Sequence, residues 1–237
     1  NNLIYLNRYN EAIKNSNSAY DIAKNDGERR FALFTNVVAY VDSGSTDAAM
    51  KEMENGYSLA KNINDAGAMS GDLTIMGNIL FEAGRYEEAK AKFTEALSVV
   101  ESSDLSEEVK ENNRRLNLYN MGRISLMAGK FEEAKKMADE FNMKSTAANN
   151  TFQIWLAHQL NGLIALQKKD YKKAISEFEN SNLQNPQTYY YLAIAYSKEG
   201  NKAEAKKNAD KCANFNALVS LNQSFVRNKA KEMLTSL

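Results

Sequence analysis

The sequence has little of what many functional classes require. Among its 237 residues there are one cysteine, one histidine and one proline. A single cysteine excludes an intramolecular disulfide framework and any zinc site built from several cysteines. The 30 basic side chains are balanced by 30 acidic ones, so the basic excess typical of nucleic-acid binders is missing. The scarcity of proline indicates long helices, because helix interiors exclude proline and the turns of loop-rich folds use it often.

Long apolar runs are missing as well. The most apolar stretch, residues 31–41, is interrupted by Thr35 and Asn36 and is shorter than the about 18 residues of a membrane span. The chain begins at Asn1 without a methionine or an apolar signal core, so we expect processing or truncation upstream. A single cysteine is compatible with the cytosol and with export alike, which leaves the compartment open. An apolar content of 43% nevertheless indicates a folded chain of one or two domains.

A repeated phrase organises the chain. Its clearest copies are Gly-Arg-Tyr-Glu-Glu-Ala at 84–89 and Gly-Lys-Phe-Glu-Glu-Ala at 129–134. Weaker copies lie at 7–12, 44–49, 169–174 and 200–205. The alanines that close the phrase are separated by 31 to 45 residues. Six units of similar length predict an array of structural repeats.

Each unit predicts two helices joined by a tight turn. An apolar stretch with helical spacing precedes the phrase, and the helix after it places Ala89, Phe93 and Ala96 on one face. The glycine that opens the phrase suits the left-handed backbone that ends a helix.

Glycines also recur inside the first helices, seven residues before the turn. They are Gly77, Gly122 and Gly162. A glycine in a helix interior costs about 1 kcal/mol relative to alanine. We therefore expect each one to permit close approach of the paired helix, whose own small residue is the recurrent alanine.

The pattern resembles the tetratricopeptide repeat, in which antiparallel helices alternate around a Gly-x-aromatic turn and an alanine–aromatic–alanine series. The match is best over residues 70–103 and extends over nearly the whole chain. The resemblance implies an all-α fold, a right-handed superhelical α-solenoid of antiparallel helix pairs in a single domain. The expected units are 1–26 (partial), 27–66, 67–105, 106–146, 147–185 and 186–216, followed by a C-terminal capping helix at 217–237.

Most units here exceed the family's usual period of about 34 residues. The sequence Asp-Leu-Ser-Glu at 104–107 predicts an N-cap at Asp104 that starts a long helix toward Gly129. Pro186 lies where the family favours a helix stop between two repeats.

The resemblance also implies a concave face, lined by the first helices, that holds a peptide or a partner's helix. Aromatic and arginine side chains anchor interfaces, and asparagine can bond a partner's backbone. The expected partner-binding residues are Phe34, Asn78, Tyr119, Asn120, Arg123, Gln159, Tyr190, Tyr191 and Ile194, with Val38 on the same face. The alternative for Tyr190 and Tyr191 is internal packing, and for the polar residues it is simple solvation.

One branch of the family binds the C-terminal carboxylate of chaperones through a lysine, an arginine and two asparagines. Asn78 and Asn120 match the asparagines, whereas Leu156 and Leu160 stand where the next repeat would supply cations. A carboxylate would be poorly stabilised without them, so we do not expect chaperone-tail binding.

We expect no enzymatic activity, cofactor or metal, because no catalytic or metal-binding motif is present. An enzyme would need His158 in a pocket with an acidic partner, and both His158 and Cys212 fall at expected packing positions. The predicted function is a protein–protein interaction scaffold that binds a peptide or protein partner in the concave groove, with homo-oligomerisation left open. The alternative is a regulatory module in which a peptide or small ligand controls an attached or partner domain.

Overall fold

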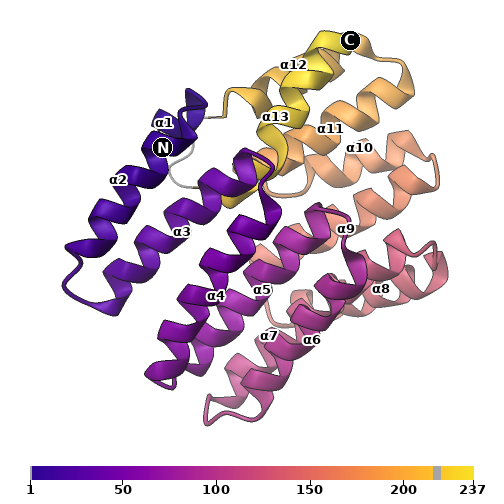
Figure 1. Ribbon diagram of the computed structural model, residues 1–237. Coiled ribbons are helices and arrows are strands. Elements are labelled where there is room, and N and C mark those ends of the chain that lie inside the picture. The colour runs from indigo at the N-terminus through magenta and orange to yellow at the C-terminus, as the bar shows by residue number, and fades with distance from the viewer. Residues whose placement is uncertain (1, 216–219) are drawn as a thin grey trace. The chain divides into compact units, whose positions relative to one another are not determined.

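The computed structural model describes residues 2–215 and 220–237 (Figure 1). Thirteen helices and no strand lie within these ranges, which confirms the expected all-α solenoid of antiparallel helix pairs. The first six helices are α1 (Asn2–Tyr5), α2 (Tyr9–Asp21), α3 (Asp26–Asp42), α4 (Thr46–Asn62), α5 (Ala66–Glu82) and α6 (Tyr86–Glu101). The others are α7 (Glu107–Met127), α8 (Phe131–Ala147), α9 (Thr151–Gln167), α10 (Tyr171–Glu179), α11 (Pro186–Glu199), α12 (Lys202–Ala213) and α13 (Leu221–Ser236). In this described part of the chain, no helix has the length and apolar character that crossing a bilayer requires.

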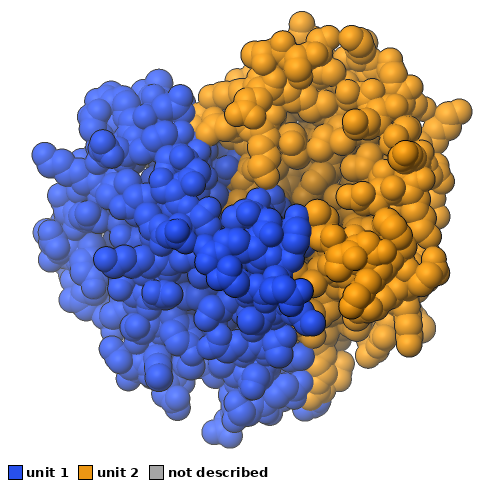
Figure 2. Space-filling model, turned by 45° about the vertical axis from the view of Figure 1, so that its right-hand side comes forward, with its two compact units in different colours: residues 1–110, 217–224 blue, residues 111–216, 225–237 orange. Residues whose placement is uncertain are grey.

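The contacts within the chain divide it into two compact units (Figure 2). Unit 1 holds residues 1–110 and 217–224, and unit 2 holds residues 111–216 and 225–237. Both α7 and α13 therefore contribute residues to each unit. The single repeat domain and its internal boundaries stay predictions, and the boundary expected between residues 216 and 217 lies outside the described residues.

The turns inside the helix pairs have the predicted backbone. Left-handed φ angles between 73° and 93° occur at Gly44, Gly84, Gly129 and Gly200. Lys169 occupies the same turn between α9 and α10 with φ 61°, although it carries a side chain. A left-handed conformation costs about 1–2 kcal/mol for a residue with a Cβ atom. The repeat geometry thus imposes this turn even where the sequence lacks the glycine that favours it.

The long helix expected between residues 104 and 129 is α7. Its start was misplaced by two residues, because Ser106 rather than Asp104 precedes the helix, and the Ser106 Oγ accepts a hydrogen bond from Val109 N at 3.4 Å. This bond satisfies one of the N–H groups that the first helical turn leaves free.

Pro186 lies in the first turn of α11, where its missing N–H costs nothing, so it starts a helix rather than stopping one.

The interior glycines do permit close approach, but against a different group from the one expected. A Cβ atom added to Gly77 would lie 2.4 Å from Phe93 Cε1, and one added to Gly162 would lie 2.5 Å from Phe178 Cε1. The phenylalanine ring of the paired helix, and not its alanine, therefore occupies the space that the glycine leaves. At Gly122 the nearest atom is Leu160 Cδ2, at 2.8 Å, from α9.

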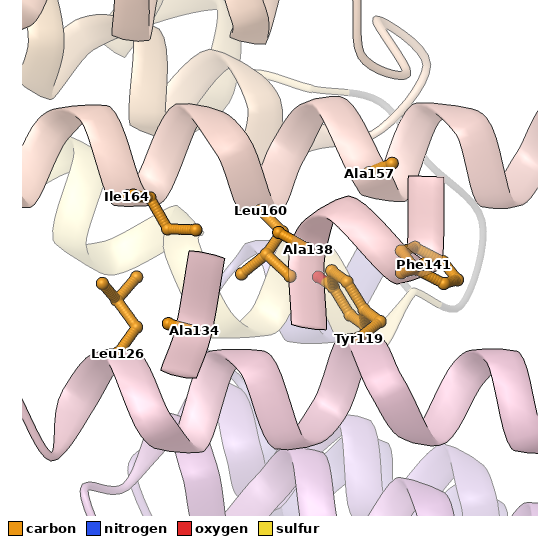
Figure 3. Packing of buried hydrophobic residues seen from close by; sticks show 8 residues of the cluster. All are labelled: Tyr119, Leu126, Ala134, Ala138, Phe141, Ala157, Leu160 and Ile164. Atoms are coloured by element: carbon orange, nitrogen blue, oxygen red, sulfur yellow. The ribbon is translucent and has the colours of Figure 1, made fainter. Parts of the chain in front are cut away.

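The pair α7/α8 places its aromatic ring one turn later than α5/α6 does. In α8, Ala138 takes the position of Phe93 in the repeat, and Phe141 takes the position of Ala96. The Phe141 ring is fully buried and packs against Tyr119 with centroids 5.7 Å apart. Figure 3 shows both rings in the cluster that also contains Leu126, Ala134, Ala138, Ala157, Leu160 and Ile164.

The first residues of α13 pack within unit 1. Leu221 contacts an apolar cluster of α1, α2 and α3 that includes Ile4 and Val38. The Ser224 hydroxyl donates a hydrogen bond to Val38 O at 3.1 Å, across 186 residues of sequence. Helix α13, in the described part of the expected capping segment, therefore starts against the N-terminal helices.

Candidate functional site

The nine expected partner-binding residues differ in their burial. The half-buried ones are Phe34, Asn78, Tyr190, Tyr191 and Ile194. The buried ones are Tyr119, Asn120, Arg123 and Gln159. Tyr119 and Arg123 were expected to be exposed, as an aromatic and an arginine anchor. They are instead only 8% and 6% exposed.

Tyr119 is the centre of an internal network in unit 2. Its hydroxyl donates to Gln159 Oε1 at 2.6 Å, and its ring lies against Phe141. The Arg123 guanidinium lies over the same ring, with Cζ 5.3 Å from the centroid. These contacts join α7, α8 and α9, so three expected partner contacts serve the packing of the unit. Their contact with a partner stays a prediction.

The tyrosines of α11 also make internal contacts. Tyr191 stacks on Phe178 of α10 with centroids 5.4 Å apart, and Tyr190 lies 6.1 Å from Tyr191. Tyr189 packs against Phe215. Internal packing, the alternative weighed for Tyr190 and Tyr191, therefore describes Tyr191 in this structure.

A hollow of ≈ 390 Å³ opens in unit 1 between α3, α4 and α5. Its apolar lining residues are Phe31, Leu33, Phe34, Met53 and Ile75. Its other lining residues are Arg30, Glu52, Gly56 and Asp72. Phe31 is 63% exposed although it is a large apolar residue, so the rim of the hollow presents an uncovered aromatic ring to solvent. Of the expected partner-binding residues, Phe34 belongs to this hollow.

An ion pair closes the polar side of the hollow. Arg30 Nη2 donates to Asp72 Oδ1 at 2.9 Å, and Arg30 Nη1 donates to Gly56 O at 3.3 Å. The second carboxylate oxygen, Asp72 Oδ2, is buried and has no hydrogen-bond partner among the described residues. Burial raises the pKa of Asp72 to about 6, with a smaller contribution from the charge of Asp65, while Arg30 acts in the opposite direction.

The helices explain why these groups meet. Arg30 lies in the first turns of α3 and Asp72 lies in the first half of α5, so both first helices present them to α4 between them. Gly56 lies in the interior of α4, and a Cβ atom there would be 4.0 Å from Asp72 Oδ2, an ordinary contact distance. The glycine therefore enlarges the hollow without being required by a clash.

Sequence reasoning missed this site because its polar members are far apart in the chain. The ion pair joins residues 42 positions apart, and no short motif contains both. The signal that was available is a charged residue, Asp72, directly before the apolar series that begins at Leu73 in a first helix. A buried acid of this kind requires a partner, and Arg30, one of two arginines in the preceding first helix, supplies it.

His158 has the acidic partner that an enzyme would need, since its Nδ1 lies 2.9 Å from Glu177 Oε2. The pair links α9 to α10, and neither side chain is fully buried. Cys212 is buried in α12, and this burial raises the pKa of its thiol to about 12. The thiol is therefore protonated at neutral pH and unreactive as a nucleophile. The absence of enzymatic activity stays a prediction.

No protein-family model matches the chain, and no curated protein matches it. Among solved structures, BtubC (BKLC) from P. vanneervenii is similar with a TM-score of 0.54 and 15% identity, covering 86% of this chain and 87% of that chain. A tetratricopeptide repeat protein from Parabacteroides merdae is 14% identical with a TM-score of 0.49, covering 96% and 97%. The TPR2AB domain of yeast Sti1, in its pHSP90 complex, is 13% identical with a TM-score of 0.43, covering 99% and 94%. At such identities the similarity concerns the fold alone.

Proposed function

We infer, from the tetratricopeptide-like fold of this chain, that it is a non-enzymatic interaction array that binds a peptide or protein partner on its first helices. The observation that carries this proposal is the hollow between α3, α4 and α5, with the uncovered ring of Phe31 at its rim. Two first helices border the hollow, which is the position that the resemblance assigns to partner binding. The expected contact Phe34 lies in its wall.

The chemistry of the hollow favours a partner that inserts one side chain with an apolar body. Five of its lining residues are apolar, and burying a side chain of leucine size against them contributes roughly 1.5–3 kcal/mol. Aromatic side chains, phenylalanine included, are enriched in protein interfaces, so the uncovered ring of Phe31 is a group that a partner would bury. A segment lying along α3 and α5 would cover Phe31 while its side chain fills the hollow.

A peptide selection tests the proposal. Peptides selected from a random library on the whole chain should lose at least about 10-fold in affinity for Phe31→Ala, because one buried aromatic contact is worth about 1.4 kcal/mol or more. The variant Gly56→Leu should weaken the same peptides by filling the hollow from its α4 wall. Binding is measured by isothermal calorimetry or fluorescence anisotropy.

Phe152→Ala is the matched control, because Phe152 is another exposed phenylalanine, 54% exposed, on α9 of unit 2. Its truncation should leave the selected peptides bound as before. Selected peptides that bind Phe31→Ala and Gly56→Leu as tightly as the unchanged chain would contradict the assignment of the hollow. The concave-face residues of unit 2, the regulatory alternative and self-association stay predictions.

A further inference from the structure

The unsatisfied oxygen of Asp72 distinguishes this hollow from a purely apolar cavity. The Asp72 side chain is 9% exposed and forms part of the wall, and only its Oδ1 is bonded by Arg30. A buried acceptor without a donor costs about 1–3 kcal/mol. A ligand that brings a donor to Oδ2 recovers this cost, so the site favours N–H groups over apolar ends.

The charges around the hollow favour a cation. Its charged lining residues are Arg30 from α3, Glu52 from α4 and Asp72 from α5, and Asp65 acts on Asp72 from the start of α5. The arginine balances one of the carboxylates, which leaves the lining with an excess of negative charge. An anionic side chain in the hollow would be repelled by this negative charge, which water screens poorly there. A cation would neutralise the charge.

We propose that the hollow selects a lysine side chain of the partner segment, with its aliphatic stem along Phe31, Phe34 and Ile75 and its ammonium group at Asp72 Oδ2 and Glu52. This inference rests on the proposed function and names the side chain that the partner inserts. The long aliphatic stem of lysine can pack against the apolar lining residues while its charged end reaches the carboxylate.

Lysine fits this arrangement better than arginine does. A guanidinium group binds carboxylates best through two parallel hydrogen bonds, but Arg30 already uses Asp72 Oδ1. The one remaining acceptor, Asp72 Oδ2, suits the compact ammonium group of lysine, which does not need two acceptor oxygens in one plane. A second guanidinium beside Arg30 would also place two planar cations on one carboxylate.

Binding requires the groups that surround Asp72 Oδ2 to move. Asp72 Oδ2 has almost no accessible surface before a ligand arrives. Phe31 is largely exposed, so its ring is free to turn without loss of core packing. The stem of the ligand then replaces water against the rings while the ammonium group reaches the carboxylate.

Small capped amino acids provide the test. The probes are N-acetyl-lysine N-methylamide and N-acetyl-norleucine N-methylamide, which share the stem and differ in the ammonium group, titrated into the whole ¹⁵N-labelled chain. The lysine probe should shift the amide signals of Gly56, Asp72 and Ile75 and bind about 10-fold more tightly than the norleucine probe, as a charge-assisted hydrogen bond predicts. The arginine analogue should fall between the two.

Variants of the carboxylates locate the effect. Asp72→Asn should remove most of the preference for lysine over norleucine, and Glu52→Gln should remove part of it. Glu54→Gln is the matched control, because Glu54 lies on the same helix and is not a lining residue of this hollow. If Asp72→Asn does not fold, the titrations of Glu52→Gln and Glu54→Gln decide the matter.

The affinity for the lysine probe should also depend on pH. Because the pKa of Asp72 is about 6, the carboxylate is ionised above this pH and becomes neutral below it. Affinity should therefore be highest above pH 6 and decline as the pH falls through this value, and Asp72→Asn should abolish that decline.

Three other results of the titrations would contradict the lysine preference. Equal binding of the norleucine and lysine probes in the hollow would overturn the lysine preference and leave the proposed partner site standing. Signal shifts confined to other residues, or no shift with either probe, would overturn it as well. The peptide selection with Phe31→Ala judges the partner site independently of these results.

Discussion

The pairs α5/α6 and α7/α8 share one turn phrase, yet they use their interior glycine in different ways. In α5/α6 the ring of Phe93 fills the space beside Gly77, so the glycine serves its own pair. In α7/α8 the aromatic ring lies one turn later, at Phe141, and Leu160 of the next pair approaches Gly122 instead. A shift of the aromatic residue by one turn thus accompanies a change in the nearest neighbour of the glycine, from a ring of its own pair to a side chain of the next pair.

The same displacement changes what the first helix can offer a partner. Phe141 packs on Tyr119, whose hydroxyl then bonds Gln159 of α9. In α5 the residue in the position of Tyr119 is Thr74, which carries no ring. In unit 2, Tyr119 and Gln159 of the expected face therefore take part in internal packing, whereas unit 1 has a hollow beside α5.

Removing the two rings should have the largest effect. Phe93→Ala and Phe141→Ala should each lower the free energy of unfolding by about 3–5 kcal/mol, because both rings are buried and leave a cavity. Urea denaturation followed by circular dichroism measures this loss. The double change Phe141→Ala with Ala138→Phe should not restore stability, since Leu160 already occupies the space at Gly122. Full recovery would show that the two aromatic positions are interchangeable.

Adding a methyl group at the two glycines should give a smaller and unequal effect. At Gly77 the new Cβ would overlap the stiff ring of Phe93, so Gly77→Ala should destabilise by about 1–3 kcal/mol. At Gly122 the obstacle is the flexible end of Leu160, and the alanine also gains about 1 kcal/mol of helix propensity. Gly122→Ala should therefore be nearly neutral in thermal or urea unfolding. Equal losses at both sites would contradict the different roles of the two glycines.

A further loss of stability, smaller than that of either ring, concerns the hydroxyl group of Tyr119. Tyr119→Phe should keep the stacking on Phe141 and lose the bond to Gln159, at a cost of about 1–2 kcal/mol because a buried acceptor is left without its donor. Tyr196→Phe is the control, since its hydroxyl bonds Glu179 at the surface and its loss should be close to zero. A Tyr119→Phe variant as stable as the unchanged chain would show that the network does not contribute to unit 2.

Local features of the fold could be predicted because they depend on neighbouring residues. The helix pairs follow from periodicity and the left-handed turns from glycine, and both are confirmed. The first residue of α7 was misplaced because Asp104 and Ser106 are both good caps, and only the path of the chain selects Ser106. The hollow was not predictable in the same way, because the meeting of Arg30 with Asp72 depends on the register of three packed helices.

The hydrogen bond between Ser224 and Val38 has a consequence for how the protein is made. Most contacts in a helical array are local, so each pair can fold soon after it leaves the ribosome. The apolar cluster on α1, α2 and α3 is an exception, since Leu221 belongs to it and is synthesised only after all the intervening helices. The packing of α1, α2 and α3 is thus completed only after α13 has been made, and a nascent chain lacking α13 exposes the apolar surface of this cluster.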